Sequence, residues 1–224
     1  MTTEHQHDRS IDLHDHQHGH AHDRGIKGFL RYVKLLAKMW RSPVSDAVVA
    51  LINPSTGEHV VDLGAGMGPA TVTAARRGAH VLAVDPTPYM RRILGARRFA
   101  QRTRRRITVV DGAAESIPAT DGTTDALWSV NAMHHWTDRT LAAAEITRVL
   151  RAGGRAVLVD EDFDDPNHPW YEQFTGRHSQ HRHEFDDVNP VEMADLFTAA
   201  GCQRAAGSIE RVAGRPAKVV RVTR

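Results

Sequence analysis

The sequence predicts a doubly wound α/β fold, with a mostly parallel sheet of seven strands, helices on both faces and a C-terminal antiparallel hairpin. Short β-rich runs alternate with helical patterns through the middle of the chain, as in a parallel sheet joined by right-handed crossovers. A glycine-rich loop joins the first of these strands to the first helix that follows it. Near the C-terminus, two further β-rich runs flank a turn containing glycine and proline, which indicates a hairpin.

The chain begins with a histidine-rich segment. Seven of the 15 histidines lie before residue 23. Residues 1–25 carry too few apolar side chains to offset the chain entropy that folding would cost, so we expect a disordered tail. Imidazoles bind nickel, zinc and copper, so weak transition-metal binding by this tail is left open.

Two helices are expected between the tail and the first strand. Apolar residues recur at helical spacing from Ile26 to Trp40. Ser42 and Pro43 are typical of the N-cap and first position of a second helix. We expect residues 26–53 to form a helical lid over the opening of a ligand-binding site. Packing of the first helix on the sheet edge, or docking on an anionic membrane, are the alternatives.

The remaining elements follow in order to the C-terminus, so that residues 26–224 form one domain. The expected parallel strands are His59–Leu63, His80–Val84, Ile107–Val110, Ala126–Val130 and Arg155–Asp160. The expected helices are Pro69–Arg77, Pro88–Ala100, Arg139–Leu150 and Pro190–Ala200, and the hairpin strands are Ala205–Val212 and Ala217–Val222. Residues 162–189 show no regular pattern and are expected to form a substrate-side insertion. The order of elements is that of a Rossmann-like sheet.

Composition narrows the class of protein. At 224 residues, with 41% hydrophobic and 25% charged side chains, the chain suits one globular domain. The single cysteine, Cys202, excludes an intramolecular disulfide and a cysteine-based zinc site. No run of 18 apolar residues and no secretory signal pattern occur, so we expect a cytoplasmic protein without a membrane span.

Eight arginines lie between residues 91 and 106, which raises the question of a nucleic-acid contact. Four of them are expected on one helical face: Arg91, Arg98, Arg102 and Arg105. Such a face is usually just solvated. In addition, Asn131 is followed by Ala132-Met133-His134 rather than by the Pro-Pro-aromatic run that grips a flipped base. Nucleic acid is therefore disfavoured as a partner.

The glycine loop carries the strongest functional signal. Asp62-Leu63-Gly64-Ala65-Gly66-Met67-Gly68 joins an expected strand to a helix that starts at Pro69. Glycines are needed where the backbone turns tightly and where a ligand approaches the main chain. Asp85 ends the next strand, 21 positions after Gly64, a distance that suits a carboxylate binding two ribose hydroxyls.

The pattern around this loop favours S-adenosylmethionine over a dinucleotide. The dinucleotide fingerprint places glycine at its first, third and sixth positions, with the pyrophosphate at the helix N-terminus. Here the sixth position is Pro69, and glycine stands at the fifth. Asp62 also sets a carboxylate near the loop, which would repel a pyrophosphate and attract the ammonium of S-adenosylmethionine.

The sequence resembles the class I S-adenosylmethionine-dependent methyltransferases, in the small-molecule branch that includes ubiquinone and menaquinone biosynthesis enzymes. The resemblance covers residues 54–160 well and the remainder by the order of elements. It rests on Val60–Gly68, Ala83–Asp85 with Met90, Asp111–Pro118, Asp125–Trp128 through His134–Trp136, and Val149–Arg155. One small departure is Ala65, where cysteine is common in the family.

The resemblance implies a role for each cofactor-binding residue. Asp62 and the backbone of Gly64, Ala65 and Gly66 would hold the methionine part, Asp85 the ribose hydroxyls, and Pro86 would lie beside the adenine. Asp111 would accept from the adenine amine, Gly112 and Ala113 would supply backbone contacts, and Asn131 would line the methyl-transfer end. The fold implied is the doubly wound sheet, and the activity implied is methyl transfer to a small-molecule acceptor.

Two histidines and two tryptophans are candidates at the acceptor side. His134 and His135 follow the fourth strand on the ligand side of the sheet, and His135 is the candidate general base for an oxygen or nitrogen acceptor. His134, Trp136 and Trp170 are candidate substrate contacts. The alternative is that one histidine packs under the cofactor and the other caps the next helix. No metal ligand is expected in the site, because methyl transfer from a sulfonium needs none.

Two other classes of function remain as alternatives. One is a nicotinamide-dependent oxidoreductase, disfavoured by Asp62 and Pro69. The other is a non-catalytic cofactor- or metal-binding protein that uses the histidine-rich tail. The choice between an oxygen, nitrogen or carbon acceptor stays open at this point.

Overall fold

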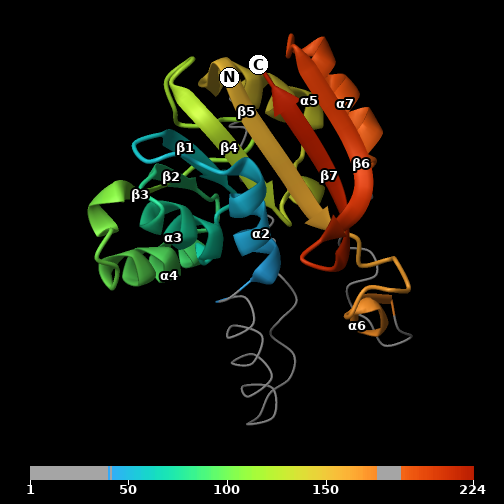
Figure 1. Ribbon diagram of the computed structural model, residues 1–224, viewed down its shortest axis with the longest axis horizontal. Coiled ribbons are helices and arrows are strands. Elements are labelled where there is room, and N and C mark those ends of the chain that lie inside the picture. Colours follow the sequence, from blue (N-terminus) through green and yellow to red (C-terminus); the bar gives the residue numbers. More distant parts are fainter. Residues whose placement is uncertain (1–39, 41, 176–187) are drawn as a thin grey trace, which may run out of the picture.

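The computed structural model describes residues 40, 42–175 and 188–224 and contains the seven-stranded sheet that the sequence predicts (Figure 1). Across the sheet the strand order is β3-β2-β1-β4-β5-β7-β6. The strands are β1 His59–Leu63, β2 His80–Val84, β3 Ile107–Val110, β4 Thr124–Val130, β5 Leu150–Glu161, β6 Arg204–Val212 and β7 Arg215–Thr223. Strands β1 to β5 pair in parallel, and β7 lies antiparallel between β5 and β6. The predicted fold class is confirmed.

Six α-helices and two 3₁₀ turns connect the strands in the described part of the chain. They are α2 Pro43–Ile52, α3 Pro69–Arg76, α4 Pro88–Phe99, η1 Arg104–Arg106, η2 Met133–His135, α5 Arg139–Val149, α6 Tyr171–Thr175 and α7 Pro190–Ala199. Polar N-caps fix where several of them begin. The Asp138 carboxylate accepts from Leu141 N at 2.9 Å, and the Asn189 side chain accepts from Val191 N at the same distance.

Helices cover both faces of the sheet, and each face has its own core (Figure 1). On one face, α2 and α3 pack against the strands around Trp128, which is fully buried. On the other face, α5 and α7 pack against the strands around Leu127 and Phe197, which are also fully buried. Strands buried on both faces form near-continuous apolar runs, which is why their positions were readable from sequence.

The starts of two parallel strands differ from the prediction. Strand β4 begins at Thr124 and β5 at Leu150, both earlier than expected. The pairing of β4 with β5 continues across a register shift between Thr124 and Ala126, and the glycines at 153 and 154 hide this bulged pairing from a pattern search. The segment after β5 also contains the short helix α6.

The lid prediction needs correction for its second half. Helix α2 is a core helix, because Val44, Val48 and Val49 are each 0% exposed and pack against α3 and the sheet. Their spacing places them on one face of the helix. The histidine-rich tail, residues 1–25, and the first expected helix, apart from Trp40, lie outside the described residues.

The arginine-rich segment is also corrected. Helix α4 ends at Phe99, so Arg102 and Arg105 do not continue a face of it. Several arginines of the segment bind backbone carbonyls instead, Arg97 and Arg98 among them. Arg97, 9% exposed, donates to Met67 O at 3.1 Å, and Arg98 Nε donates to Ile107 O at 2.6 Å. Within the described residues, no helix has the length and apolar character needed to cross a membrane.

Candidate functional site

The glycine loop emerges from β1 at the point where the strand order changes direction, with β2 on one side of β1 and β4 on the other. Ligands of open α/β sheets bind at the carboxyl ends of strands at such a switch point. Gly64, Gly66 and Gly68 all have positive φ, between 53° and 72°. A Cβ on Gly64 would lie 2.6 Å from the Ala132 Cβ, whereas a Cβ on Gly66 would meet no heavy atom within 4 Å. The loop is therefore packed at Gly64 and open at Gly66.

Asp85 ties the second strand to this loop. Its Oδ2 accepts from Gly66 N at 2.7 Å and its Oδ1 accepts from Thr87 N at 2.8 Å. The carboxylate is 5% exposed, while the following Pro86 is exposed. A carboxylate has about four lone-pair sites, so these two bonds leave acceptor capacity for a diol. Asp85 thus holds the loop in shape and still has lone pairs that could accept hydrogen bonds from ribose hydroxyls.

Asp111, at the end of β3, is joined to Asp85 by an arginine that sequence reasoning missed. Arg91 Nη1 of α4 donates to Asp111 Oδ1 at 2.9 Å and to Asp85 O at 2.8 Å. The Asp111 side chain is 72% exposed. Gly112 leaves no room for a side chain, because a Cβ there would lie 2.7 Å from Pro118 Cδ, and Ala113 bridges to Ser116.

Asp62 lies beneath the loop and is 3% exposed. Its Oδ2 accepts from the hydroxyl of Thr71 on α3. Burial raises the pKa of the Asp62 carboxyl to about 7, and the neighbouring charge of Asp85 adds to the rise, while the Thr71 bond opposes it. A cation bound above the loop would favour the ionised form of this carboxyl.

Asn131, just past β4, has φ 53°, a conformation that asparagine tolerates better than most residues. Its Nδ2 donates to Glu161 Oε1 at 2.9 Å and its Oδ1 accepts from Glu161 N at 2.7 Å. Glu161 Oε2 in turn accepts from Arg215 Nη1 at 2.7 Å and contacts His168 Nε2 at 3.0 Å. Asn131 therefore joins the ends of β4 and β5, and its amide is committed to that task.

His134 is held by a buried carboxylate. His134 Nδ1 lies 2.8 Å from Asp160 Oδ2, and Asp160 also accepts from the backbone N–H groups of Ala132, Met133 and His134 at 3.0 to 3.3 Å. Burial alone would raise the pKa of Asp160, but the His134 ring and these N–H groups outweigh it and hold the pKa below its usual value. A charged Asp160 favours the proton on Nδ1, which makes Nε2 the basic nitrogen of His134.

The two residues after His134 differ from it in exposure. His135 is exposed, with its ring centroid 4.0 Å from that of His134. Trp136 is 7% exposed and belongs to the core under α5. The prediction of Trp136 as a substrate contact is therefore corrected, because the η2 turn directs the next side chain inward.

Trp170 lies in an aromatic cluster after β5. Its ring is parallel to that of Phe163, at 6.2 Å between centroids, and Phe163 stacks on Phe174 at 4.3 Å. The guanidinium of Arg215 lies 4.9 Å from the Trp170 ring centroid. Because Arg215 also binds Glu161, the cluster is connected to the Asn131 end of the site.

The structure thus gathers most of the predicted cofactor-side residues, and the His134 segment, into two neighbouring groups. The loop, Asp85 and Asp111 form the first, and the His134–Asp160 pair with Asn131 forms the second. They meet where Gly64 packs on Ala132. Sequence reasoning missed Asp160 and Glu161, although acids directly after the apolar end of a parallel strand are a readable signal. Within the ranges that the structure describes, no cluster of three or more His, Cys, Asp or Glu side chains could hold a metal ion.

Comparison with known proteins agrees with this geometry. Residues 61–158 match a family described as a methyltransferase domain. An uncharacterized methyltransferase of Mycobacterium tuberculosis strain H37Rv is 41% identical over 106 residues, covering 47% of this chain and 41% of that protein. Demethylmenaquinone methyltransferase of Thermobifida fusca is 37% identical over 123 residues, covering 55% of this chain and 50% of that protein. The chain therefore spans half or less of these relatives.

Solved structures extend the fold similarity over more of the chain. A structure from Methanococcus maripaludis, described as that of a candidate S-adenosyl-L-methionine-dependent methyltransferase, has a TM-score of 0.62 and 20% identity, covering 87% of this chain and 91% of that one. Geranyl diphosphate C-methyltransferase of Streptomyces coelicolor, with S-adenosyl-L-homocysteine bound, has a TM-score of 0.62 and 14% identity, covering 80% of this chain and 76% of that one. At these identities the similarity establishes the fold.

Proposed function

We propose that this protein is a class I S-adenosylmethionine-dependent methyltransferase that transfers a methyl group to a small organic acceptor, and the match of residues 61–158 to a methyltransferase-domain family supports this. The observation that carries the proposal is the geometry of the glycine loop. Space beside the Gly66 α-carbon is free for a ligand, while Gly66 N donates to the Asp85 carboxylate. At Gly64 the loop packs against Ala132, in the segment that bears His134. These contacts bring the loop that we propose binds the nucleoside, and the His134 imidazole, to one edge of the sheet.

The residues at this edge fit S-adenosylmethionine. Its ammonium and sulfonium are cationic, and Asp62, Asp85 and Asp111 supply three carboxylates around the loop. Asp85 would hold the ribose hydroxyls and Asp111 the adenine amine, with Pro86 exposed beside it. No phosphate has to be accommodated, and Arg91 is already bound to Asp111 and the Asp85 carbonyl. This supports the donor over a nicotinamide dinucleotide.

The donor supplies an activated methyl group with a neutral thioether as leaving group. The chain's own contribution is to hold the acceptor in line, which in well-oriented cases lowers the barrier by about 7–11 kcal/mol. For an acceptor that loses a proton, His134 is better oriented than His135 as the base, because Asp160 fixes its ring and its tautomer. His135 remains a candidate contact at the exposed rim.

The acceptor side supports a small molecule with an apolar part. Trp170 and its aromatic neighbours, with Arg215 over the ring, offer a flat apolar surface beside a cation. Several relatives are named for small-molecule substrates, including demethylmenaquinone and dimethylglycine. We also propose a cytoplasmic location, supported by the lone cysteine, Cys202, which is buried.

The proposal is tested by incubating the protein with S-adenosylmethionine labelled in its methyl group and a fractionated metabolite extract. Label should move into a small-molecule fraction with the wild type and not with an Asp85→Ala variant that retains its fold. Transfer of label only to macromolecular fractions would contradict a small-molecule acceptor. Binding of NAD in preference to S-adenosylmethionine would contradict the donor itself and favour the oxidoreductase alternative.

A further inference from the structure

A hollow lies at the edge of the sheet opposite the glycine loop, where strands β1, β2 and β3 begin. It has a volume of about 780 Å³, which is within the usual range of about 300–1,000 Å³ for small-molecule sites. Its lining residues come from the starts of these strands and from the β3–β4 connection: His59, Val60, Val61, His80, Val81, Leu82, Arg105, Arg106, Thr108, Pro118, Ala119, Thr120, Thr123 and Thr124. The glycine loop is at the carboxyl ends of the same strands, so this hollow is separate from it.

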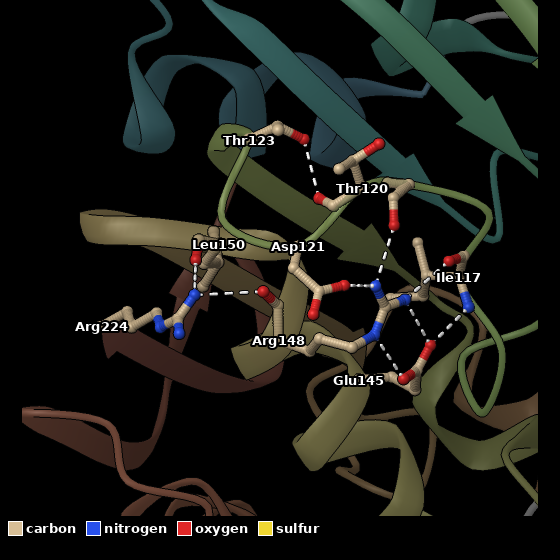
Figure 2. Close-up of polar contacts among 9 residues, drawn as sticks. Ile117, Thr120, Asp121, Thr123, Glu145, Arg148, Leu150 and Arg224 are labelled. Atoms are coloured by element: carbon tan, nitrogen blue, oxygen red, sulfur yellow. Dashed lines mark hydrogen bonds and ion pairs between the residues drawn. The ribbon is translucent and has the colours of Figure 1, made fainter.

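The hollow exists because the β3–β4 connection contains no helix. Residues 111–123 form a loop with one isolated bridge, so α5 and α7 cover the sheet only farther along. This loop forms one wall of the hollow, and Figure 2 shows the polar contacts that hold it. Arg148 of α5 donates to Ile117 O and Ala119 O at 2.9 Å and pairs with Asp121, while Thr123 Oγ1 donates to Thr120 O at 2.8 Å. These contacts order the wall without a bound ligand.

The strand starts carry a row of basic side chains. His59 and His80 are partners in the β1–β2 register, and their rings stack at 5.3 Å between centroids. Arg106 Nη1 lies 3.3 Å from His80 Nε2 and also donates to Gly78 O. Arg105 is exposed beside it. This row faces the hollow from three adjacent strand starts.

No carboxylate balances this row inside the hollow. Among its described lining residues none is acidic, and three exposed threonine hydroxyls, at 108, 120 and 123, face it instead. Asp125 of β4 lies outside the lining, and its carboxylate is already engaged: Oδ1 accepts from Arg151 and Oδ2 accepts from His59 N. The floor is apolar, with Val61 and Leu82. The lining therefore has cations and hydroxyls at the rim and a compact apolar floor.

We propose that this hollow binds a small organic phosphate, with the phosphate held by Arg105, Arg106 and His80 and the organic part on the apolar floor. The planar fork of arginine N–H donors matches the oxygens of a phosphate. Two arginines with no acidic residue in the described lining favour a dianion over a singly charged carboxylate. The site is independent of methyl transfer, because none of these residues belongs to the donor or acceptor groups.

The test uses phenyl phosphate as the probe, with phenol and benzoate as controls, titrated into the full chain at constant ionic strength. Calorimetry gives the affinity, and backbone amide shifts give the location. Phenyl phosphate should bind and shift the amides of His80, Arg106, Thr108 and Thr120, benzoate should bind more weakly, and phenol should not bind. The double variant Arg105→Gln/His80→Gln should lose at least about tenfold in affinity, the factor that 1.4 kcal/mol represents.

Arg92→Gln is the matched control, because it removes an exposed arginine of α4 outside the hollow. It should keep the phenyl phosphate affinity within about twofold. Both variants should keep the wild-type melting temperature and affinity for S-adenosylmethionine, so failure here is distinguishable from failure of the proposed function. Three results would each overturn the proposal. These are equal losses of phenyl phosphate affinity in the two variants, amide shifts centred on Gly64–Gly68, or dimerisation, detected by light scattering, that buries the hollow.

Discussion

The ring of His134 and the carboxylate of Asp160 form a buried pair at the ends of adjacent strands. Their side chains are 8% and 5% exposed, and 2.8 Å separates His134 Nδ1 from Asp160 Oδ2. Three backbone N–H groups of the turn before and at His134 also bind this carboxylate. The histidine ring is therefore fixed in orientation next to the segment that touches the glycine loop.

A matched pair of variants tests which histidine assists transfer. His134→Gln should lower kcat about 100-fold, within the range for removing a general base, with little change in the dissociation constant of S-adenosylmethionine. His135→Gln should have a much smaller effect, because its side chain is exposed and lies outside the Asp160 bond. Steady-state kinetics with the acceptor found by label transfer checks both. A larger loss from His135→Gln would reverse the assignment.

Asp160→Asn should destabilise the fold at neutral pH by about 3 kcal/mol, because the buried carboxylate accepts several hydrogen bonds. The pKa of Asp160 is lowered from its usual 3.8, so the stability it contributes is present above pH 3.8 and is lost as the pH falls through the folded-state pKa. Urea unfolding of wild type and variant at several pH values checks this. A difference in free energy of unfolding that grows toward acid pH would contradict it.

Asp62→Asn should act in the opposite direction. The pKa of Asp62 is raised from 3.8 to about 7, so stability is highest below pH 3.8 and falls as the pH rises toward 7. Its burial as an anion costs up to about 4 kcal/mol above pH 7. The variant should therefore be more stable than wild type at pH 8 while binding S-adenosylmethionine more weakly. Equal stabilisation at pH 4 and pH 8 would argue against an ionised Asp62.

For the wild type, the same carboxyl predicts a pH-dependent affinity. A cationic ligand favours ionised Asp62, so S-adenosylmethionine should bind more tightly as the pH rises through about 7. Calorimetry in buffers of different ionisation enthalpy should show proton release at pH 6. The Asp62→Asn variant is the control and should lose that proton release.

Arg148→Ala should cost about 3 kcal/mol of stability, because the side chain binds two carbonyls and two carboxylates that hold the β3–β4 loop (Figure 2). Lysine cannot reproduce the forked geometry, so Arg148→Lys should recover only part of the loss. Thermal and urea unfolding check the order wild type, Lys, Ala. Arg92→Ala, which removes an exposed arginine, is the control.

Much of the fold was predictable because its signals are local. The five parallel strands are apolar on both faces, and Pro43, Pro69, Pro88 and Pro190 each stand at a helix start. The start of β5 was missed because its pairing with β4 passes through a bulge, which depends on a distant strand. The core position of α2 depends on the same kind of long-range contact.

The candidate site was predictable in the same uneven way. The glycine loop and Asp85 lie in one motif at fixed spacing, so sequence alone brings them together. The pairing of Arg91 with Asp111, and of His134 with Asp160, joins elements that are far apart in the chain. Trp136 was assigned to the substrate because a sequence cannot show which way a side chain leaves a short turn.

The central claim is tested most directly by calorimetric titration of the full chain with S-adenosylmethionine and, separately, with NAD. One S-adenosylmethionine should bind per chain, and Asp85→Asn should weaken it by about 10- to 100-fold, the loss of a charge-assisted hydrogen bond. NAD should give no saturable heat. Saturable binding of NAD with none of S-adenosylmethionine, or an affinity unchanged in Asp85→Asn, would contradict the account.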